Sequence, residues 1–327
     1  MSRIVIHIGT HKTATTHLQD TFFKNRALLS AHGVTFPVVG DTRGQHGLAS
    51  RWIRMPPPYA LADPQAAWDD LIAAHAGRPG TLFLSSEEFS RLAPRRVDMA
   101  ELRKMLAGFD EVRLLCTLRN QASFLQSIYQ QVSVERNPGA WGPYFKRALQ
   151  ARRADGLALD YNALYDHLLT GFAPEEIRFL SYDAAVKGEG GILGAFLREL
   201  DLPLTTADLE PFAERSSNVS EDALVTLAAN MVAGGQPARP ALVARMRQAL
   251  HHGADGARPR STLFNRAEVK EMAVTFNPLN ARLSRRLKPW QPDFAVGPML
   301  GGDLNLGFRG TLGEDFWVRA CRNLRKA

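Results

Sequence analysis

The chain contains 327 residues with a formal net charge of +7, from 40 Lys and Arg against 33 Asp and Glu. Its 45% hydrophobic and 22% charged residues exclude a disordered or fibrous protein. Because Cys116 and Cys321 are the only cysteines, a disulfide framework and a cysteine-based metal cluster are excluded as well. No apolar run approaches the roughly 18 residues of a membrane span, and the start does not match a signal peptide, so we expect a cytoplasmic protein.

The first predicted elements alternate between strand and helix. Residues 3–8 (RIVIHI) form a β-branched apolar run typical of a buried strand, which ends at Gly9. Residues 13–30 then have helical spacing, with Gly33 as the stop signal. Further strands are predicted at 81–85, 112–118 and 177–181, and further helices at 64–76, 98–108, 121–134 and 188–200.

The last third of the chain is predicted to be rich in helices. We expect helices at 220–232, at 240–251 and from 265 onward, where Asn265 and Glu268 have the spacing of a capping box. Together these elements predict an α/β protein of three layers, α/β/α, with a central, mainly parallel sheet. We assign residues 1–288 to one domain and residues 289–327 to a C-terminal tail packed on it.

The turn after the first strand has the composition of an anion site. It contains four threonines, Lys12 and His11, and it lies where the predicted helix begins (Thr10, His11, Lys12, Thr13, Ala14, Thr15 and Thr16). Free N–H groups at a helix start attract anions, and Lys12 adds a full positive charge. A nucleotide kinase would show GxxxxGK[ST] here, but the residue directly before Lys12 is His11 and not glycine. This argues against ATP hydrolysis while leaving phosphate binding intact.

The segment HIGTHKTATTHLQ (7–19) resembles the 5′-phosphosulfate loop of sulfotransferases that use 3′-phosphoadenosine-5′-phosphosulfate (PAPS), with Ala14 where glycine is usual. A second segment, VRLLCTLRNQASFLQS (112–127), resembles the part of that family that grips the 3′-phosphate through an Arg and a Ser eight residues later, here Arg119 and Ser127. An Arg offers a planar fork for phosphate oxygens, and Ser127 follows about two helical turns on.

Weaker matches extend the resemblance over about residues 3–288. Tyr182 matches a tyrosine near the adenine, and Arg215 matches a possible further 3′-phosphate contact. The resemblance implies a P-loop-like core, PAPS as co-substrate and no metal. It assigns the cofactor-binding residues Thr10, His11, Lys12, Thr13, Ala14, Thr15, Thr16, Arg119, Ser127, Tyr182 and Arg215.

The family mechanism requires a positive charge on the leaving phosphate and a base for the acceptor proton. Lys12 suits the first role. For the base, His46 lies in an irregular segment where relatives place a catalytic His or Glu, and an imidazole exchanges protons near neutral pH. Glu87 and Glu88, which follow a strand end, are the alternatives.

The acceptor is a small molecule or, by family analogy, a carbohydrate. Residues 38–62 and 136–160 are candidates to line its pocket, where aromatic side chains either stack on a sugar or pack beneath long loops (Trp52, Tyr59, Trp141 and Tyr144). We expect no nucleic-acid partner, and the oligomeric state stays open. Two other functions remain: a P-loop small-molecule kinase that needs Mg²⁺, and a non-catalytic binder of 3′-phosphoadenosine nucleotides.

Overall fold

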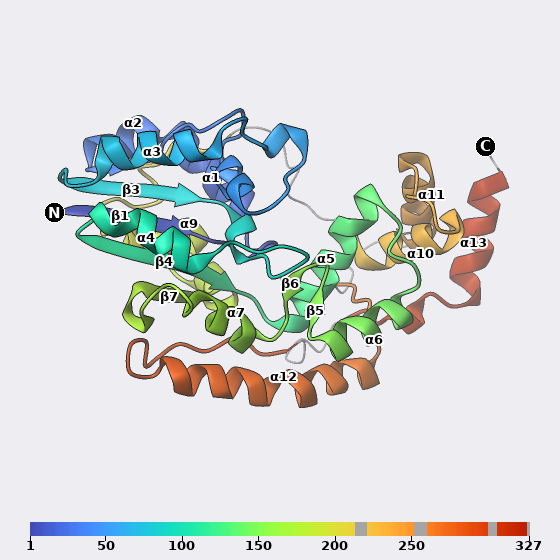
Figure 1. The fold of residues 1–327 in the computed structure, drawn as a ribbon. Coiled ribbons are helices and arrows are strands. Elements are labelled where there is room, and N and C mark those ends of the chain that lie inside the picture. Colours follow the sequence, from blue (N-terminus) through green and yellow to red (C-terminus); the bar gives the residue numbers. More distant parts are fainter. Residues whose placement is uncertain (213–220, 252–259, 300–305, 326–327) are drawn as a thin grey trace. The chain divides into compact units, whose positions relative to one another are not determined.

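The computed structural model describes residues 1–212, 221–251, 260–299 and 306–325. The chain divides into two compact units. We call the first the sheet unit; it comprises Met1–Asn120, Asp155–Arg215 and Leu279–Gly297. The second, the helical unit, comprises Gln121–Ala154, Ser216–Pro278 and Pro298–Ala327. Figure 1 shows the elements of both.

A parallel sheet of five strands forms the sheet unit, in the order β2-β3-β1-β4-β7. Its strands are β1 (Ser2–His7), β2 (Val34–Thr35), β3 (Gly80–Ser85), β4 (Glu111–Leu118) and β7 (Ile177–Ser181). The register places His7 opposite both Ser85 and Leu115, so β1 and β3 end at one edge. The residues that follow these strands therefore meet at that edge, as the sequence predicts.

Both faces of this sheet are buried, which requires a layer of helices on each side. On one face Val5, Phe83 and Leu115 form a core cluster with Phe22 and Phe196 from two helices. The neighbouring strand residues point to the opposite face and are at most 1% exposed (Ile4, Ile6, Leu82 and Leu84). The helices are α1 (Thr15–Lys24), α2 (Arg26–Ala31), α3 (Pro64–His75), α4 (Met99–Met105), α7 (Tyr161–Leu168), α8 (Tyr182–Lys187) and α9 (Gly191–Glu199). The predicted three-layer α/β/α class is confirmed.

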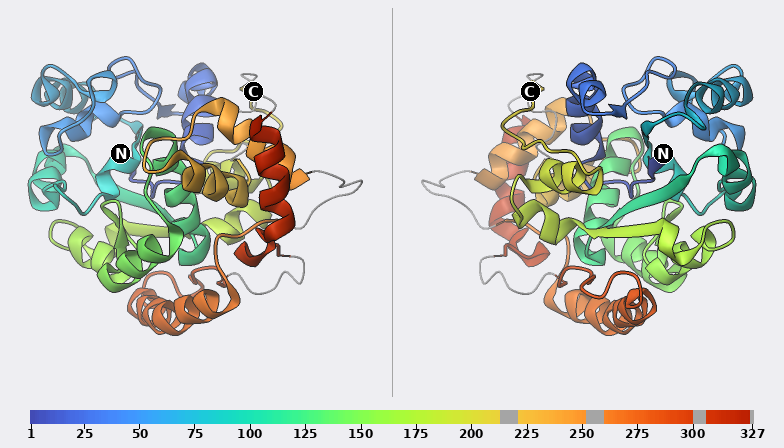
Figure 2. Two further views of the ribbon diagram at one scale, coloured as in Figure 1. Left: turned by 90° about the vertical axis from the view of Figure 1, so that its right-hand side faces the viewer. Right: turned by 90° about the vertical axis from the view of Figure 1, so that its left-hand side faces the viewer.

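The helical unit is built around helices that pack on one another. It contains α5 (Gln121–Glu135), α6 (Trp141–Ala151), α10 (Ala223–Ala233), α11 (Pro240–His251) and α13 (Glu314–Arg325), while α12 (Arg266–Leu287) contributes residues to both units. Leu224 of α10, Met246 of α11 and Phe316 of α13 share one buried cluster, and the three helices lie side by side in Figures 1 and 2. The short strand β5 (Arg153–Ala154) belongs to this unit, and the short strand β6 (Leu157–Ala158) belongs to the sheet unit.

The structure departs from the sequence prediction in several elements. The helix predicted at 13–30 is two helices, because Asn25 between them turns its side chain to the carbonyl oxygens of Thr21 (2.8 Å) and Glu210 (2.9 Å). Strand β2 was not predicted, since two residues carry no periodic pattern. Helix α13 was not predicted either, because its apolar residues acquire their partners only from α10 and α11.

Other predictions hold closely. Strands β1, β3, β4 and β7 and helices α3, α5 and α11 begin and end within two residues of the expected positions. The capping box is also confirmed: the Asn265 N–H donates to the Glu268 carboxylate (2.9 Å) and the Glu268 N–H donates to the Asn265 side chain (2.8 Å). Within the described ranges, no helix combines the length and the apolar character needed to cross a bilayer.

Burial of His7 in the central strand makes stability depend on pH. Desolvation lowers the pKa of His7 from 6.5 to about 3, although its backbone hydrogen bond acts in the opposite direction. The folded state therefore keeps this ring neutral while the unfolded chain protonates it below about 6.5, so stability is complete above that pH and falls towards pH 3. Below pH 6.5 we expect His7 to lower the free energy of unfolding by up to about 1.4 kcal/mol for each pH unit.

Urea unfolding of wild type and His7→Asn at pH 7 and pH 5 measures this effect. The variant is expected to be less stable at pH 7 because its polar side chain fits the strand less well, but its stability should change less between the two pH values. An equal pH dependence in both proteins would show that His7 is not the group responsible.

Candidate active site

The loop between β1 and α1 is anchored to the neighbouring strand and braced by its own threonines. The Thr10 N–H and hydroxyl both donate to the Thr117 carbonyl oxygen of β4, each at 3.0 Å. The hydroxyls of Thr13 (2.6 Å) and Thr15 (3.4 Å) donate to the Thr10 carbonyl oxygen. These buried hydroxyls therefore stabilise the loop through hydrogen bonds to its own backbone and to β4. Thr16, by contrast, is exposed at the start of α1.

Three residues of this loop have left-handed backbone conformations. The φ angles are +92° at Gly9, 60° at Lys12 and 63° at Ala14. At Gly9 an added Cβ would lie 2.8 Å from the Glu87 Cβ, so the loop approaches Glu87 more closely than any side chain permits. Ala14 keeps the conformation that glycine favours, at a cost of roughly 1 kcal/mol for a residue with a Cβ. The loop thus retains its tight turn despite the alanine.

The structure brings Lys12 and Arg119 together from distant parts of the sheet unit. The Arg119 guanidinium, which follows the end of β4, donates to the Lys12 carbonyl oxygen through Nη1 at 3.2 Å. Burial and then the nearby charge of Arg119 lower the pKa of Lys12, and Glu87 partly opposes this shift. Two adjacent cations that are partly removed from water form a site that is stabilised by an anion.

Aromatic and polar side chains fix the backbone around Arg119. The Arg119 guanidinium carbon lies 5.0 Å from the centre of the Tyr182 ring, at the start of α8. The Tyr161 hydroxyl donates to the Arg119 carbonyl oxygen. Asp183 accepts from the Asn120 backbone N–H (3.1 Å) and side chain (3.2 Å), which ties the end of β4 to the end of β7. Tyr182 therefore lies beside Arg119.

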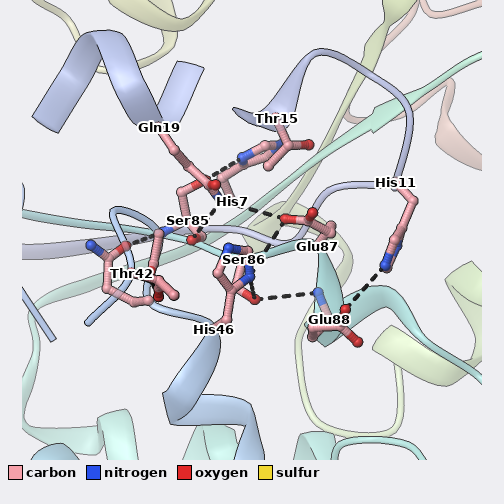
Figure 3. A network of polar contacts seen from close by, with 12 residues as sticks. His7, His11, Thr15, Gln19, Thr42, His46, Ser85, Ser86, Glu87 and Glu88 are labelled. Atoms are coloured by element: carbon pink, nitrogen blue, oxygen red, sulfur yellow. Dashed lines mark hydrogen bonds and ion pairs between the residues drawn. The ribbon is translucent and has the colours of Figure 1, made fainter. Parts of the chain in front are cut away.

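His46 and Glu87 face each other at the end of β3 (Figure 3). His46 Nδ1 lies 3.0 Å from the Ser86 hydroxyl and 3.7 Å from the Glu87 carboxylate. Gln19 of α1 donates to the Ser85 carbonyl oxygen (3.0 Å) and, at 3.4 Å, to the same Glu87 carboxylate. In the tautomer whose Nδ1 carries the proton, Nδ1 donates to the Ser86 or Glu87 oxygen and Nε2 is the nitrogen that can accept a proton.

Glu88 is bound differently from Glu87. His11 Nε2 lies 3.2 Å from one carboxylate oxygen of Glu88, and Arg91 Nε donates to the other at 2.6 Å. Burial by itself raises the pKa of Glu88, but the hydrogen bonds and charges of His11 and Arg91 outweigh it and hold the pKa well below its usual range. Because Glu88 stays ionised and has both oxygens occupied, it is a poor proton acceptor and serves to hold His11 in the loop (Figure 3).

The sequence also predicts that Ser127 and Arg215 bind the donor. Ser127 lies on α5 in the helical unit, half-buried, and Arg215 lies outside the described residues. Sequence reasoning assigned no role to Gln19, Arg91 or Tyr161. Their partners lie 42 or more positions away along the chain, except for the Arg91 bond to Glu88, so no local pattern reveals them.

Comparison with known proteins found similar chains only among solved structures. No family model matches the chain, and no curated protein sequence matches it. The structure is similar to a sulfotransferase from Alicyclobacillus acidocaldarius, with 14% identity over 70% of this chain and 92% of that one and a TM-score of 0.42. It is also similar to the sulfotransferase domain from the curacin biosynthetic pathway, with 14% identity over 84% of this chain and 97% of that one and a TM-score of 0.37.

Because Ala14 has a left-handed backbone conformation, we expect its replacement by glycine to stabilise the protein. Ala14→Gly removes the Cβ that opposes the positive φ, so we expect the free energy of unfolding to rise by about 1 kcal/mol. The matched control is Ala281→Gly, at an exposed position inside α12, which should lower it by about 0.5–1 kcal/mol. Urea unfolding of the three proteins measures both effects, and equal losses in the two variants would contradict the left-handed conformation.

Proposed function

We propose that this chain is a sulfotransferase that moves a sulfuryl group from PAPS to a hydroxyl or amine of an acceptor. The observation that carries the proposal is the meeting of Lys12 and Arg119 at the strand edge, with the Arg119 guanidinium bonded to the Lys12 carbonyl oxygen at 3.2 Å. Two clustered cations beside a helix start suit a donor that is highly charged at both ends.

The chain's own groups fit such a donor. Lys12 and the backbone N–H groups of residues 13–16 would bind the 5′-phosphosulfate, because the first N–H groups of α1 lack partners within the helix. Arg119 would bind the 3′-phosphate, to which the sequence resemblance also assigns Ser127. The Tyr182 ring, which already packs against Arg119, would lie near the adenine.

The reaction then needs an in-line transfer and one proton acceptor. The acceptor oxygen or nitrogen forms a bond to sulfur, the bond from sulfur to the bridging phosphate oxygen breaks, and the acceptor proton passes to the base. Lys12 would stabilise the negative charge that grows on the leaving phosphate, a contribution of roughly 3 kcal/mol to the barrier. The His46–Glu87 pair supports His46 as the base, with Glu87 orienting its ring. The ion pair between Glu88 and Arg91 favours His46 over Glu88 for that role.

Calorimetry with 3′-phosphoadenosine-5′-phosphate tests the donor site. We expect tight binding without added metal, weakened about 10- to 100-fold by Lys12→Ala or Arg119→Ala, because each removes a charged hydrogen-bond donor. Ser127→Ala should weaken it less. Lys24→Ala is the matched control, since this lysine ends α1 and pairs with Glu210. Preference for ATP with Mg²⁺ would indicate a kinase instead.

Two variants test the base. His46→Ala and Glu87→Ala should leave the affinity for the nucleotide nearly unchanged, because neither residue belongs to the predicted donor contacts. We expect the rate of sulfuryl loss from PAPS, with water as the acceptor, to fall about 10²- to 10⁴-fold in His46→Ala and less in Glu87→Ala. Chromatography of the released nucleotide measures this rate. A wild-type rate in both variants would show that neither His46 nor Glu87 contributes to the reaction.

A further inference from the structure

The residues that follow α12 run along the outer edge of the parallel sheet. β7 is the last strand in the sheet order, so among the described residues its outer side lacks a strand partner. The backbone N–H and carbonyl groups on such an edge need other hydrogen-bond partners. The sequence predicts residues 289–327 as a tail packed on the domain, and the family resemblance ends before them.

Gln291 supplies partners for this edge. Its side-chain amide accepts a hydrogen bond from the Phe179 N–H at 2.8 Å and donates one to the Ile177 carbonyl oxygen at 2.9 Å. One side chain thus makes the pair of bonds that a residue of a further parallel strand would make. Gln291 is 4% exposed, so both bonds are formed away from water, where losing them is costly.

The same segment is fixed to the sheet unit at two more points. The Gln291 N–H donates to the Leu287 carbonyl oxygen at the end of α12, at 2.8 Å. The Phe294 ring lies 5.9 Å from the Phe179 ring of β7. We call residues 291–297 the edge strap. Because all of these residues belong to the sheet unit, the strap and the end of β7 form part of one compact body.

The edge strap ends against Asp183. A Cβ added at Gly297 would lie 2.3 Å from Asp183 Oδ2 and 2.6 Å from the Asp183 Cβ, so the backbone of the strap touches this side chain. The backbone of Gly297 lies outside the left-handed region, so it is this close approach that requires a glycine.

Asp183 in turn holds the chain beside Arg119. Asp183 Oδ2 accepts from the Asn120 backbone N–H at 3.1 Å, and Oδ1 accepts from the Asn120 side chain at 3.2 Å. Asn120 directly follows Arg119 in the sequence. Tyr182, which directly precedes Asp183, packs its ring 5.0 Å from the Arg119 guanidinium carbon. A displacement of Asp183 therefore disturbs both the chain that carries Arg119 and the ring beside its guanidinium.

We propose that the edge strap is a positioning element for Arg119 and that it acts through Asp183. The effect on donor binding rests on the proposed function. Gln291 anchors the strap to β7, and Gly297 brings its backbone against Asp183. The carboxylate is thereby kept where it bonds to the chain that carries Arg119. The start of the tail thus contributes to the phosphate site through the packing of its backbone.

Amide hydrogen exchange of the full chain, read by NMR, tests the contact itself. In Gly297→Ala the added methyl group must displace Asp183, so the Asn120 N–H should lose its acceptor and exchange about tenfold faster than in wild type. Gln291→Leu frees the strap from β7 by a different change and should raise the same rate. Unchanged exchange at Asn120 in both variants overturns the proposal, whether or not the chain binds a nucleotide.

Two controls separate this effect from a general loss of stability. The Ile8 N–H, which donates to the Leu115 carbonyl oxygen inside the sheet at 2.9 Å, is the internal reference and should exchange as in wild type. Gly142→Ala is the matched variant: this glycine follows the buried Trp141 in α6, and the space around it is open. Equal acceleration at Asn120 and Ile8 in Gly297→Ala would mean that the whole sheet opens, which also overturns the proposal.

A double-mutant cycle tests the consequence for the donor, with calorimetry of 3′-phosphoadenosine-5′-phosphate as the readout. Gly297→Ala and Asp183→Ala should each weaken binding about tenfold, while Gly142→Ala leaves it unchanged. The double variant Gly297→Ala/Asp183→Ala should bind as Asp183→Ala does, because no bond to Asn120 is left to break. Losses that multiply in the double variant would show that Gly297 acts by another route and overturn the proposal.

The two experiments distinguish this proposal from the proposed function. A wild-type chain that does not bind the nucleotide refutes the proposed donor site, and the exchange rate of Asn120 still decides whether the strap holds Asp183. A wild type that binds, together with a Gly297→Ala variant of equal affinity, refutes the strap as a positioning element and leaves the donor site standing.

Discussion

The site depends on one constraint, the closeness of two cations at the end of a buried parallel sheet. Lys12 and Arg119 follow adjacent strands, β1 and β4, and the Arg119 guanidinium reaches the Lys12 carbonyl oxygen. Partial burial and, after it, the charge of Arg119 lower the pKa of Lys12, so an anion beside them would stabilise both charges. Much of the neighbouring structure holds these charges in place, including the Thr10 bonds to β4 and the Tyr161 bond to the Arg119 carbonyl oxygen.

Two consecutive glutamates after β3 have separate tasks because their neighbours differ. Glu88 is fixed between His11 and Arg91, so it acts as a permanent charge that holds the loop. Glu87 has longer contacts to His46 and Gln19, at 3.7 Å and 3.4 Å, and it lies against the glycine that opens the loop. Glu87 thus contacts both the loop between β1 and α1 and His46, which is the base in the proposed mechanism.

The sequence by itself determined the buried strands and the loop that follows β1, because these depend on local patterns: β-branched apolar runs, a glycine, and a lysine among threonines. It also determined that Arg119 follows a strand of the same sheet. Because parallel strands end at a common edge, this places Arg119 at the same edge as Lys12. Only the tertiary structure decided the break at Asn25, the helix α13, the different partners of Glu87 and Glu88, and the burial of Trp141. Each of these depends on side chains far apart in the sequence, whose contacts arise when the chain folds and leave no periodic trace.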